Sequence, residues 1–247
     1  MLSLASQSLG LASPMMMSSN ADAPIKLGVN GFGRIGRQVV RIAMDRESFI
    51  LKHINSPMAP EYMKYLLEHD TVHGRFSGTC EVDGDALIIN GAKVTLSATR
   101  VPAEIPWTQT GVEYVCESTG AFTTTEGCMA HIEGGAKKVI ISAPAKDADT
   151  PTLVVGVNQD EYDSSMAVVS CASCTTNGLA PLVKVITRPC SSCSPRRQPK
   201  ALMWTHSMTS RLMFRCGSSM SLMTTHLQRI DCVRLVMRCL RRKQLGT

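Results

Sequence analysis

The stretch Ile25-Lys-Leu-Gly-Val-Asn-Gly-Phe-Gly-Arg-Ile-Gly36 decides the fold of this chain. Its apolar residues alternate with other residues up to the first glycine of the turn, which is the pattern of a β-strand. From Ile35 to Ala43 apolar residues recur at helical spacing, and residues 49–54 resemble a second strand. A strand, a helix and a second strand in this order predict a βαβ unit.

The chain up to residue 187 continues this alternation. Further strands are predicted at residues 86–89, 94–96, 112–116, 138–141, 152–155 and 167–169, and further helices at 62–68, 124–131 and 179–186. Asp83-Gly84 and Asn90-Gly91 are hairpin-turn signals that flank the first two of these strands. Strands that alternate with helices, together with continuous apolar runs, predict an α/β fold with a largely parallel, buried sheet.

The three glycines of the opening stretch form a G-x-G-x-x-G pattern between a strand and a helix. In this context Gly31 permits a tight turn, Gly33 lets a pyrophosphate approach the backbone, and Gly36 allows close packing of helix and strand. The pattern therefore predicts a Rossmann-type, doubly wound domain that binds a dinucleotide at the helix N-terminus. A glycine turn with a purely structural role is the alternative.

An acidic residue about 20 positions after this pattern commonly binds the adenosine ribose. Ser56 occupies that position here. A carboxylate would repel the 2′-phosphate of NADP, whereas a hydroxyl can bond either a ribose hydroxyl or a phosphate. The hypothesis is that the site accepts NADP as well as NAD. A serine that only caps the following turn is the alternative.

A second chemical motif is Cys171-Ala-Ser-Cys-Thr-Thr-Asn-Gly178, between the strand-like residues 166–170 and the predicted helix at 179–186. A thiol at a strand-to-helix turn lies close to unpaired backbone N–H groups and the positive end of the helix dipole. Both favour the nucleophilic thiolate. Cys174 is therefore the candidate nucleophile, and a small buried cysteine is the alternative.

Five segments in order resemble the phosphorylating glyceraldehyde-3-phosphate dehydrogenase family, over residues 25–186. They are Val29-Asn-Gly-Phe-Gly-Arg-Ile-Gly-Arg37, Ile105-Pro-Trp107, Glu117-Ser-Thr-Gly-Ala-Phe122, Lys138-Val-Ile-Ile-Ser-Ala-Pro144 and Ser173-Cys-Thr-Thr-Asn177. The resemblance implies an oxidoreductase that converts glyceraldehyde 3-phosphate, inorganic phosphate and NAD(P) to 1,3-bisphosphoglycerate. It also implies a homotetramer and a cysteine thioester intermediate.

The resemblance assigns roles to individual positions. Cys174 resembles the nucleophile, and Ser173 and Thr175 resemble contacts of the substrate phosphate. The implied cofactor-binding residues are Gly31, Phe32, Gly33, Arg34, Ile35, Gly36, Ser56, Arg100, Thr119, Gly120, Phe122 and Ser142. Ser56 departs from the family pattern, where an acid is usual.

After residue 187 the composition changes. Residues 1–187 contain 14 Lys and Arg against 19 Asp and Glu, whereas residues 188–247 contain 12 against 1, together with half of the ten cysteines. One segment, Lys200-Ala-Leu-Met-Trp-Thr-His-Ser-Met-Thr209, resembles the family's sequence around its catalytic histidine. It makes His206 the candidate base beside the Cys174 thiolate. A less similar fragment ends at His226.

Four regions are expected. Residues 1–23 are a disordered leader or presequence, 24–173 a dinucleotide-binding domain, 174–187 the start of an α+β catalytic domain that stays incomplete, and 188–247 a poorly ordered basic tail. A reading-frame error or truncated gene, a genuine basic appendage and a divergent folded domain are competing explanations of the tail. An inactive dinucleotide-binding fragment and a basic-tailed nucleic-acid-binding protein are the alternative functions.

Composition limits the class of protein further. No apolar run approaches the ~20 residues of a membrane helix, so no membrane partner is expected. Neither C-x-x-C pair, at Cys171 and at Cys190, is followed by ligands at zinc-finger spacing, so no metal is expected. The expected location is the cytoplasm, with a plastid as the alternative.

Overall fold

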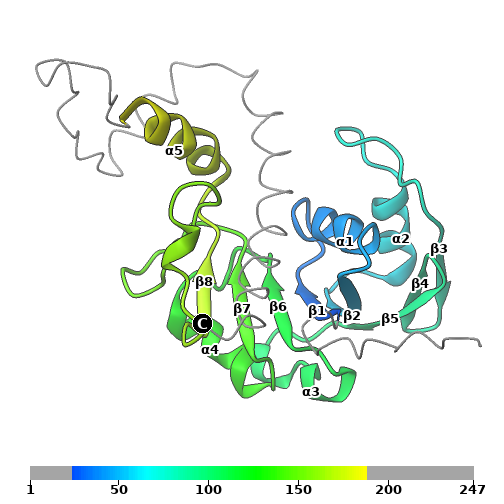
Figure 1. The fold of residues 1–247 in the computed structure, drawn as a ribbon. Helices are drawn as coiled ribbons and strands as arrows, with labels where there is room; N and C mark the ends of the chain where they lie inside the picture. The colour runs from blue at the N-terminus through cyan, green and yellow to red at the C-terminus, as the bar shows by residue number, and fades with distance from the viewer. Residues whose placement is uncertain (1–23, 188–247) are drawn as a thin grey trace, which may run out of the picture.

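The computed structural model describes residues 24–187 of the 247-residue chain, which form an eight-stranded sheet with helices on both faces (Figure 1). The strands lie in the order β3-β4-β5-β2-β1-β6-β7-β8. Their bounds are Ile25–Asn30 (β1), Phe49–Asn55 (β2), Cys80–Asp83 (β3), Ala86–Ile89 (β4), Ala92–Ser97 (β5), Tyr114–Glu117 (β6), Lys138–Ile141 (β7) and Val168–Ser170 (β8). The α/β doubly wound prediction is confirmed.

Helices cover the sheet on two sides. Their bounds are Gly36–Met44 (α1), Pro60–Glu68 (α2), Trp107–Thr110 (α3), Thr125–Glu133 (α4) and Cys174–Thr187 (α5), with short 3₁₀ turns at Pro102–Glu104 and Gln159–Glu161. On one face Val39 and Val40 of α1 and Met63 of α2 pack in a core with β1 and β2. On the other face Trp107 and Cys128, from α3 and α4, pack in a second core with β6 and β7.

The sheet is largely parallel, as predicted, and is antiparallel at one end. Strands β5, β2, β1, β6, β7 and β8 are parallel to one another, whereas β3–β4 and β4–β5 are antiparallel pairs. The two predicted hairpin turns account for the difference, since Gly84 and Gly91 have φ angles of +57° and +79° between these strands. Two-residue turns of this kind can join only antiparallel neighbours.

The predicted strand at residues 152–155 is wrong. Thr152 forms only an isolated bridge to Ser170. The N–H of Val154 then donates to the side chain of Asn158 at 2.8 Å instead of to a strand, and the chain turns at Gly156, where φ is +88°. A side-chain acceptor has replaced the ladder acceptor at this point.

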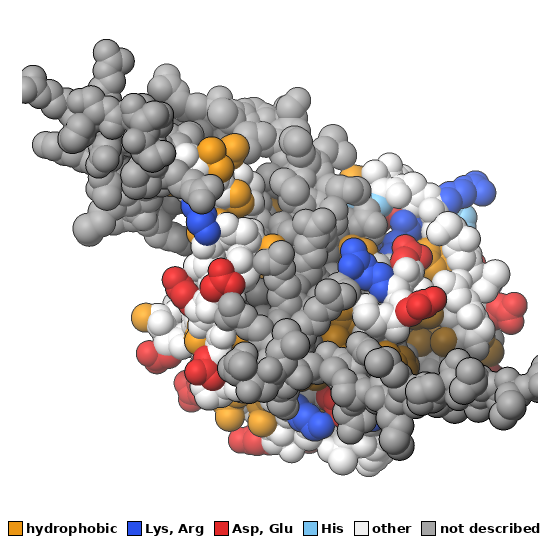
Figure 2. All heavy atoms as spheres, in the orientation of Figure 1, with side chains coloured by type: hydrophobic (Ala, Val, Ile, Leu, Met, Phe, Trp, Pro, Cys, Tyr) orange, Lys and Arg blue, Asp and Glu red, His pale blue; other side chains and the backbone are white. Residues whose placement is uncertain are grey.

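Helix α5 begins at Cys174, five residues before the predicted start at residue 179. The helix also continues past Pro181, although proline removes a backbone donor. Leu182 and Val185 on this helix are 60% and 70% exposed, and Figure 2 shows apolar side chains at the surface where α5 lies. Predictions for residues 1–23 and 188–247 fall outside the described residues.

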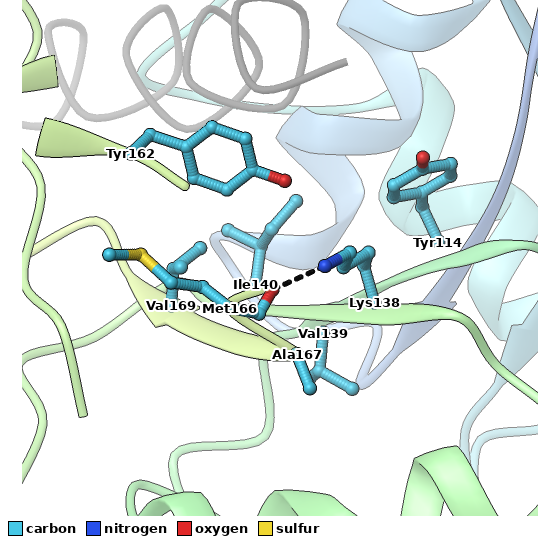
Figure 3. Close-up of a pocket in the computed structure, with 8 residues that line it drawn as sticks. All are labelled: Tyr114, Lys138, Val139, Ile140, Tyr162, Met166, Ala167 and Val169. Atoms are coloured by element: carbon cyan, nitrogen blue, oxygen red, sulfur yellow. Dashed lines mark hydrogen bonds between the residues drawn. The ribbon is translucent and has the colours of Figure 1, made fainter. Parts of the chain in front are cut away.

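A small hollow lies on the sheet over β6, β7 and β8 (Figure 3). Tyr114, Ile140 and Tyr162 line it, and Lys138 spans its side by donating from Nζ to the carbonyl of Met166 at 2.6 Å. Because Tyr114 and Lys138 are the first residues of their strands, the hollow lies toward the amino ends of the sheet. Ligands of open α/β sheets bind at the opposite, carboxyl ends.

Candidate functional site

The carboxyl ends of five parallel strands bring most of the predicted site residues to one edge of the sheet. Gly31 follows β1, Ser56 follows β2, Thr119 lies two residues after β6, Ser142 follows β7, and Cys174 lies four residues after β8. The strand order reverses beside β1, because β2 adds on one side of it and β6 on the other. Such a reversal is where dinucleotides bind in doubly wound sheets.

The glycine turn after β1 has room for no side chain at two of its positions. Gly31 has a φ of +94°, and a Cβ there would lie 2.8 Å from the backbone N of Thr119. A Cβ on Gly36 would lie 1.8 Å from the carbonyl oxygen of Gly31. The turn and the first residue of α1 are therefore in direct backbone contact, which only glycine permits.

Gly33 differs from both neighbours, because no described atom lies within 4 Å of a Cβ added there. The N-terminus of α1 beside it carries no side-chain cap from the described residues. Helix N-termini without caps expose backbone N–H donors and a partial positive charge, which suits a phosphate. The open side of Gly33 therefore fits a pyrophosphate. Of the intervening residues, Phe32 is buried in the core and Arg34 is exposed.

The predicted adenosine-side residues lie in the segments that follow β5 and β6. Thr119 and Gly120 are exposed beyond β6, with Gly120 at a φ of +77°, and Phe122 is half-buried with its ring edge-to-face with His131. Arg100 is exposed beyond β5. These positions leave polar groups and backbone at the surface beside Gly31.

Ser56 is 97% buried and its hydroxyl oxygen accepts a hydrogen bond from the N–H of Met58 at 3.3 Å. This bond is the turn-capping contact that the sequence allowed as an alternative. The position at the end of β2 is also the one from which a ribose is bound in this fold class. The contacts of Ser56 are therefore compatible with both predicted roles, ribose binding and turn capping.

Cys174 is the first residue of α5, and among the five described cysteines it alone is not buried. Burial raises the pKa of the Cys80 thiol to about 11 and the pKa values of the Cys116 and Cys128 thiols to about 12. These three remain thiols at neutral pH, and Cys171 is buried as well. Exposure and the helix N-terminus single out Cys174 as the described cysteine suited to act as a nucleophile.

Side chains around Cys174 hold its turn in place. The amide of Asn177 donates to the carbonyls of Cys171 and Ser173, both at 2.8 Å, and Asn177 is only 5% exposed. Ser173 caps the helix, because its hydroxyl accepts the N–H of Thr176 at 3.0 Å. Ala172 adopts a φ of +62°, which is uncommon for a residue with a side chain. These hydrogen bonds fix the backbone of the turn that carries the Cys174 thiol.

The two predicted phosphate contacts lie together at this turn, with the hydroxyl oxygens of Ser173 and Thr175 2.7 Å apart. The hydroxyl of Ser142 lies 3.0 Å from that of Ser118, at the end of the neighbouring strand. The predicted base, His206, and its weaker counterpart His226 lie outside the described residues.

The sequence interpretation missed a buried polar cluster beneath these turns. Its members are Asn30, Asn55, Trp107, Glu117 and His131, which join through hydrogen bonds of 2.6–3.2 Å. Asn30, Asn55 and Glu117 are the last residues of β1, β2 and β6. The polar residue that ends each of these three apolar strands was the signal in the sequence that could have indicated this cluster.

The sheet order, the glycine turn and the open helix N-terminus define an α/β dinucleotide-binding domain of the Rossmann type. Residues 25–125 match the family model described as "Glyceraldehyde 3-phosphate dehydrogenase, NAD binding domain". Residues 25–125 are thus similar to the NAD-binding domain of glyceraldehyde-3-phosphate dehydrogenases, and the cofactor that the description of this domain names is NAD.

Several curated relatives carry the same name. A glyceraldehyde-3-phosphate dehydrogenase of Neurospora crassa is 56% identical over 163 residues, which are 66% of this chain and 48% of the relative. Glyceraldehyde-3-phosphate dehydrogenase 2 of Trichoderma koningii is 56% identical over 165 residues, again 66% of this chain and 48% of the relative. The chain therefore spans about half the length of the curated relatives it matches. No helix within residues 24–187 is long and apolar enough to cross a membrane.

Proposed function

We propose that this chain carries the NAD site and the nucleophile of a phosphorylating glyceraldehyde-3-phosphate dehydrogenase. The observation that carries the proposal is the partly exposed Cys174 at the start of α5, at the same sheet edge as the glycine turn. The names of the relatives support the substrate, glyceraldehyde 3-phosphate, with inorganic phosphate as the second substrate.

In the proposed reaction the Cys174 thiolate attacks the aldehyde carbon, and the carbonyl oxygen takes up a proton to give a hemithioacetal. NAD supplies the acceptor for the hydride that leaves this carbon. A base removes the hydroxyl proton as a thioester forms on Cys174. An oxygen of inorganic phosphate then attacks the thioester carbon, the carbon–sulfur bond breaks, and the thiolate leaves.

Each group of described residues has a proposed part in this sequence. The backbone at Gly31–Gly36 binds the pyrophosphate, Thr119 to Phe122 bind the adenosine side, and Ser142 lies near the nicotinamide half. Ser173 and Thr175 bind phosphate, and the amide of Asn177 keeps the Cys174 turn in position through its two 2.8 Å bonds. His206 is the proposed base.

The proposed activity of the chain as it stands is low. The chain spans 48% of relatives such as that of Neurospora crassa. We expect NAD binding with turnover at least ~10³-fold below that of an intact relative, because acid–base catalysis and substrate positioning are both incomplete. An inactive dinucleotide-binding fragment is the second candidate, and the matching family model, which describes an NAD-binding domain alone, supports it.

A single-turnover assay separates the two candidates. The full chain is mixed with NAD, glyceraldehyde 3-phosphate and phosphate, and NADH is followed by absorbance, with Cys174→Ser as the control. If the chain is an active dehydrogenase, we expect a burst of up to one NADH per chain. Cys174→Ser should abolish this burst while NAD binding persists. NAD binding without a burst in either protein would establish the fragment. The nucleic-acid alternative, which rests on residues 188–247 alone, predicts salt-dependent RNA binding that their deletion removes.

The cofactor preference is the finer part of the proposal. Ser56 at the end of β2 places no carboxylate beside the adenosine ribose, so we propose that NADP binds as well as NAD. Dissociation constants for both cofactors test this, and Ser56→Asp is expected to weaken NADP binding much more than NAD binding. A preference of the unchanged chain for NAD above ~100-fold would contradict it.

The remaining assignments belong to the same proposal. Residues 24–173 are the dinucleotide-binding domain, and 174–187 begin a catalytic domain. A homotetramer in the cytoplasm is proposed for the complete protein, and size-exclusion chromatography of this chain tests whether it also assembles.

A further inference from the structure

Glu117 has a fully buried carboxylate in the polar cluster below the proposed cofactor site. Its side chain is 0% exposed, like that of His131. Oε2 accepts from Nδ2 of Asn30 at 2.6 Å and from Nε2 of His131 at 3.0 Å. Oε1 accepts from the backbone N–H of Thr119 at 2.7 Å and also from the hydroxyl of Thr119. Four donors therefore converge on one carboxyl group.

Trp107 fixes the direction of these hydrogen bonds. Its indole Nε1–H lies 3.2 Å from Nδ1 of His131, and an indole nitrogen can only donate. Nδ1 of His131 must therefore be the acceptor, so the imidazole is neutral and carries its proton on Nε2. That proton points at Glu117. Since all of its neighbours donate, Glu117 is the terminal acceptor of the cluster and is an ionised carboxylate.

The cluster joins the ends of three strands that lead into the proposed site. Oδ1 of Asn30 accepts from Nδ2 of Asn55 at 2.7 Å, which connects β1 to β2. The N–H of Gly31 donates to the carbonyl of Asn55 at 2.8 Å, and the N–H of Ser118 donates to the carbonyl of Asn30 at 2.7 Å. Glu117 thus bonds to the residue before the glycine turn as well as to its own turn.

On the other side, Glu117 orders the turn beyond β6. The Thr119 hydroxyl that donates to Glu117 accepts the N–H of Ala121 at 3.1 Å, so the order extends past Gly120. The backbone N of Thr119 also lies only 2.8 Å from the position that a Cβ on Gly31 would take. The two turns are therefore in contact. The Glu117 carboxylate bonds to Asn30, which precedes the first turn, and to Thr119 in the second.

We infer that Glu117 is a positioning residue for the dinucleotide, which holds the turn at residues 118–122 against the glycine turn at 31–36. The inference rests on the proposed placement of NAD across these two turns. Glu117 itself lies below the site and acts through Thr119 and Asn30.

Electrostatics and positioning predict opposite effects when the charge of Glu117 is removed. A buried negative charge near a pyrophosphate is repulsive, so its loss alone would tighten NAD binding. In Glu117→Gln, however, the amide Nε2 would face the donors of Asn30 and His131, and the turns would lose their common anchor. Positioning therefore predicts weaker binding.

Titration calorimetry of the full chain with NAD measures the outcome. We expect the dissociation constant to rise at least tenfold in Glu117→Gln and by less in Glu117→Asp, which keeps the charge. Hydrogen exchange should become faster at the Thr119 amide. Leu87→Ala is the control, because it opens the core in β4, at the other end of the sheet order. It should lower the melting temperature and leave the NAD dissociation constant within twofold.

Each result decides the inference. An unchanged or lower dissociation constant in folded Glu117→Gln overturns it while the proposed function stands. If Glu117→Gln does not fold, His131→Phe replaces it, since this variant removes a donor to Glu117 and keeps an aromatic ring against Phe122. An unchanged dissociation constant in that variant also overturns the inference. Absence of NAD binding by the unchanged chain would instead overturn the proposed function, and this inference with it.

Discussion

Two turns of this molecule occupy equivalent places in the fold and are built in opposite ways. The turn at residues 31–36 leads from β1 to α1, and the turn at 171–174 leads from β8 to α5, both at the carboxyl edge of the sheet. The first uses glycines and leaves the α1 N-terminus without a side-chain cap. The second caps its helix with the hydroxyl of Ser173, and the amide of Asn177 donates to the carbonyls of Cys171 and Ser173. An open N-terminus can receive an anion on its backbone, whereas a capped one presents a side chain.

The helices behind the two turns differ as well. Helix α1 is embedded, with Val39 and Val40 in the core, and Arg37 and Gln38 bonded to Asp70 at 3.2 and 2.6 Å. Helix α5 leaves Leu182 and Val185 exposed among the described residues. The helix behind the glycine turn is thus buried against the sheet. The helix that begins at Cys174 has an apolar face that the described residues leave uncovered.

The largest expected effect separates two glycines of the first turn. Gly36→Ala would place a Cβ 1.8 Å from the carbonyl oxygen of Gly31, so we expect it to lower the free energy of unfolding by at least ~3 kcal/mol. Gly33→Ala meets no described atom and should change stability by less than ~0.5 kcal/mol while weakening NAD binding at least ~10-fold. Urea unfolding and calorimetry measure the two quantities. Equal stabilities for the two variants would contradict the close contact at Gly36.

The attachment of α1 should depend on pH. Burial would raise the pKa of Asp70, but the backbone N–H groups of His73 and Val72, with the charges of His73 and Arg37, lower this pKa from 3.8 to about 2. A lowered pKa stabilises the folded state above about pH 4, and this contribution is lost as the pH falls through about 2. At ~1.4 kcal/mol per unit of pKa, the drop from 3.8 to about 2 amounts to about 2.5 kcal/mol.

Unfolding of Asp70→Asn across that pH range is the test. The variant should be less stable than the unchanged chain at neutral pH, and the difference should shrink as the pH falls from about 4 to about 2. A difference that stays constant with pH would show that the Asp70 contacts with α1 do not depend on its charge.

A smaller effect is expected at the second turn. Asn177→Ala removes the two hydrogen bonds that hold the backbone at Cys171 and Ser173, which should lower the free energy of unfolding by about 1–2 kcal/mol. Modification of Cys174 by iodoacetamide should also become slower, since the turn that presents the thiol is loosened. Asn90→Ala, in the turn between β4 and β5, serves as the control, because it removes the hydrogen bond from the N–H of Thr79 at the other end of the sheet order and should leave the modification rate unchanged. Faster modification in Asn177→Ala would mean that this amide shields the thiol rather than presents it.

The smallest effect distinguishes the two helices themselves. Leu182→Gln in α5 should change the free energy of unfolding by less than ~0.5 kcal/mol, because the side chain is 60% exposed. Val40→Ala in α1, where the side chain is fully buried, should lower it by about 1–3 kcal/mol. Thermal unfolding of both variants tests this contrast, and a large loss in Leu182→Gln would show that the α5 face is covered in solution.

The sequence predicted those parts of the fold whose signal is local. The glycine pattern located the turn into α1, and the motif around Cys174 correctly indicated a strand before it and a helix after it. The start of α5 was placed too late, because the apolar pattern begins at Leu179 whereas the cap at Ser173 starts the helix at Cys174. Residues 152–155 had strand composition, but the side chain of Asn158 took the N–H that a strand would have shared.

The candidate site was predictable as positions on strand ends and not as contacts. Nothing in the local pattern shows that Glu117 meets His131, 14 positions later in a different element, or Asn30, 87 positions earlier. The role of Ser56 is undecided for a related reason, since its bond to Met58 is compatible with either prediction. Contacts between distant segments depend on packing that periodicity does not encode.

The order of strands in the sheet also bears on synthesis. The pair β1–β2 lies at the centre, and the chain adds β3–β5 on one side of it before β6–β8 on the other. Residues 25–55 can therefore pair on the ribosome before either flank exists, and each later segment meets an edge that is already formed. Insertions after Gly84, in the turn between β3 and β4, should thus leave the pairing of β1 with β2 unchanged.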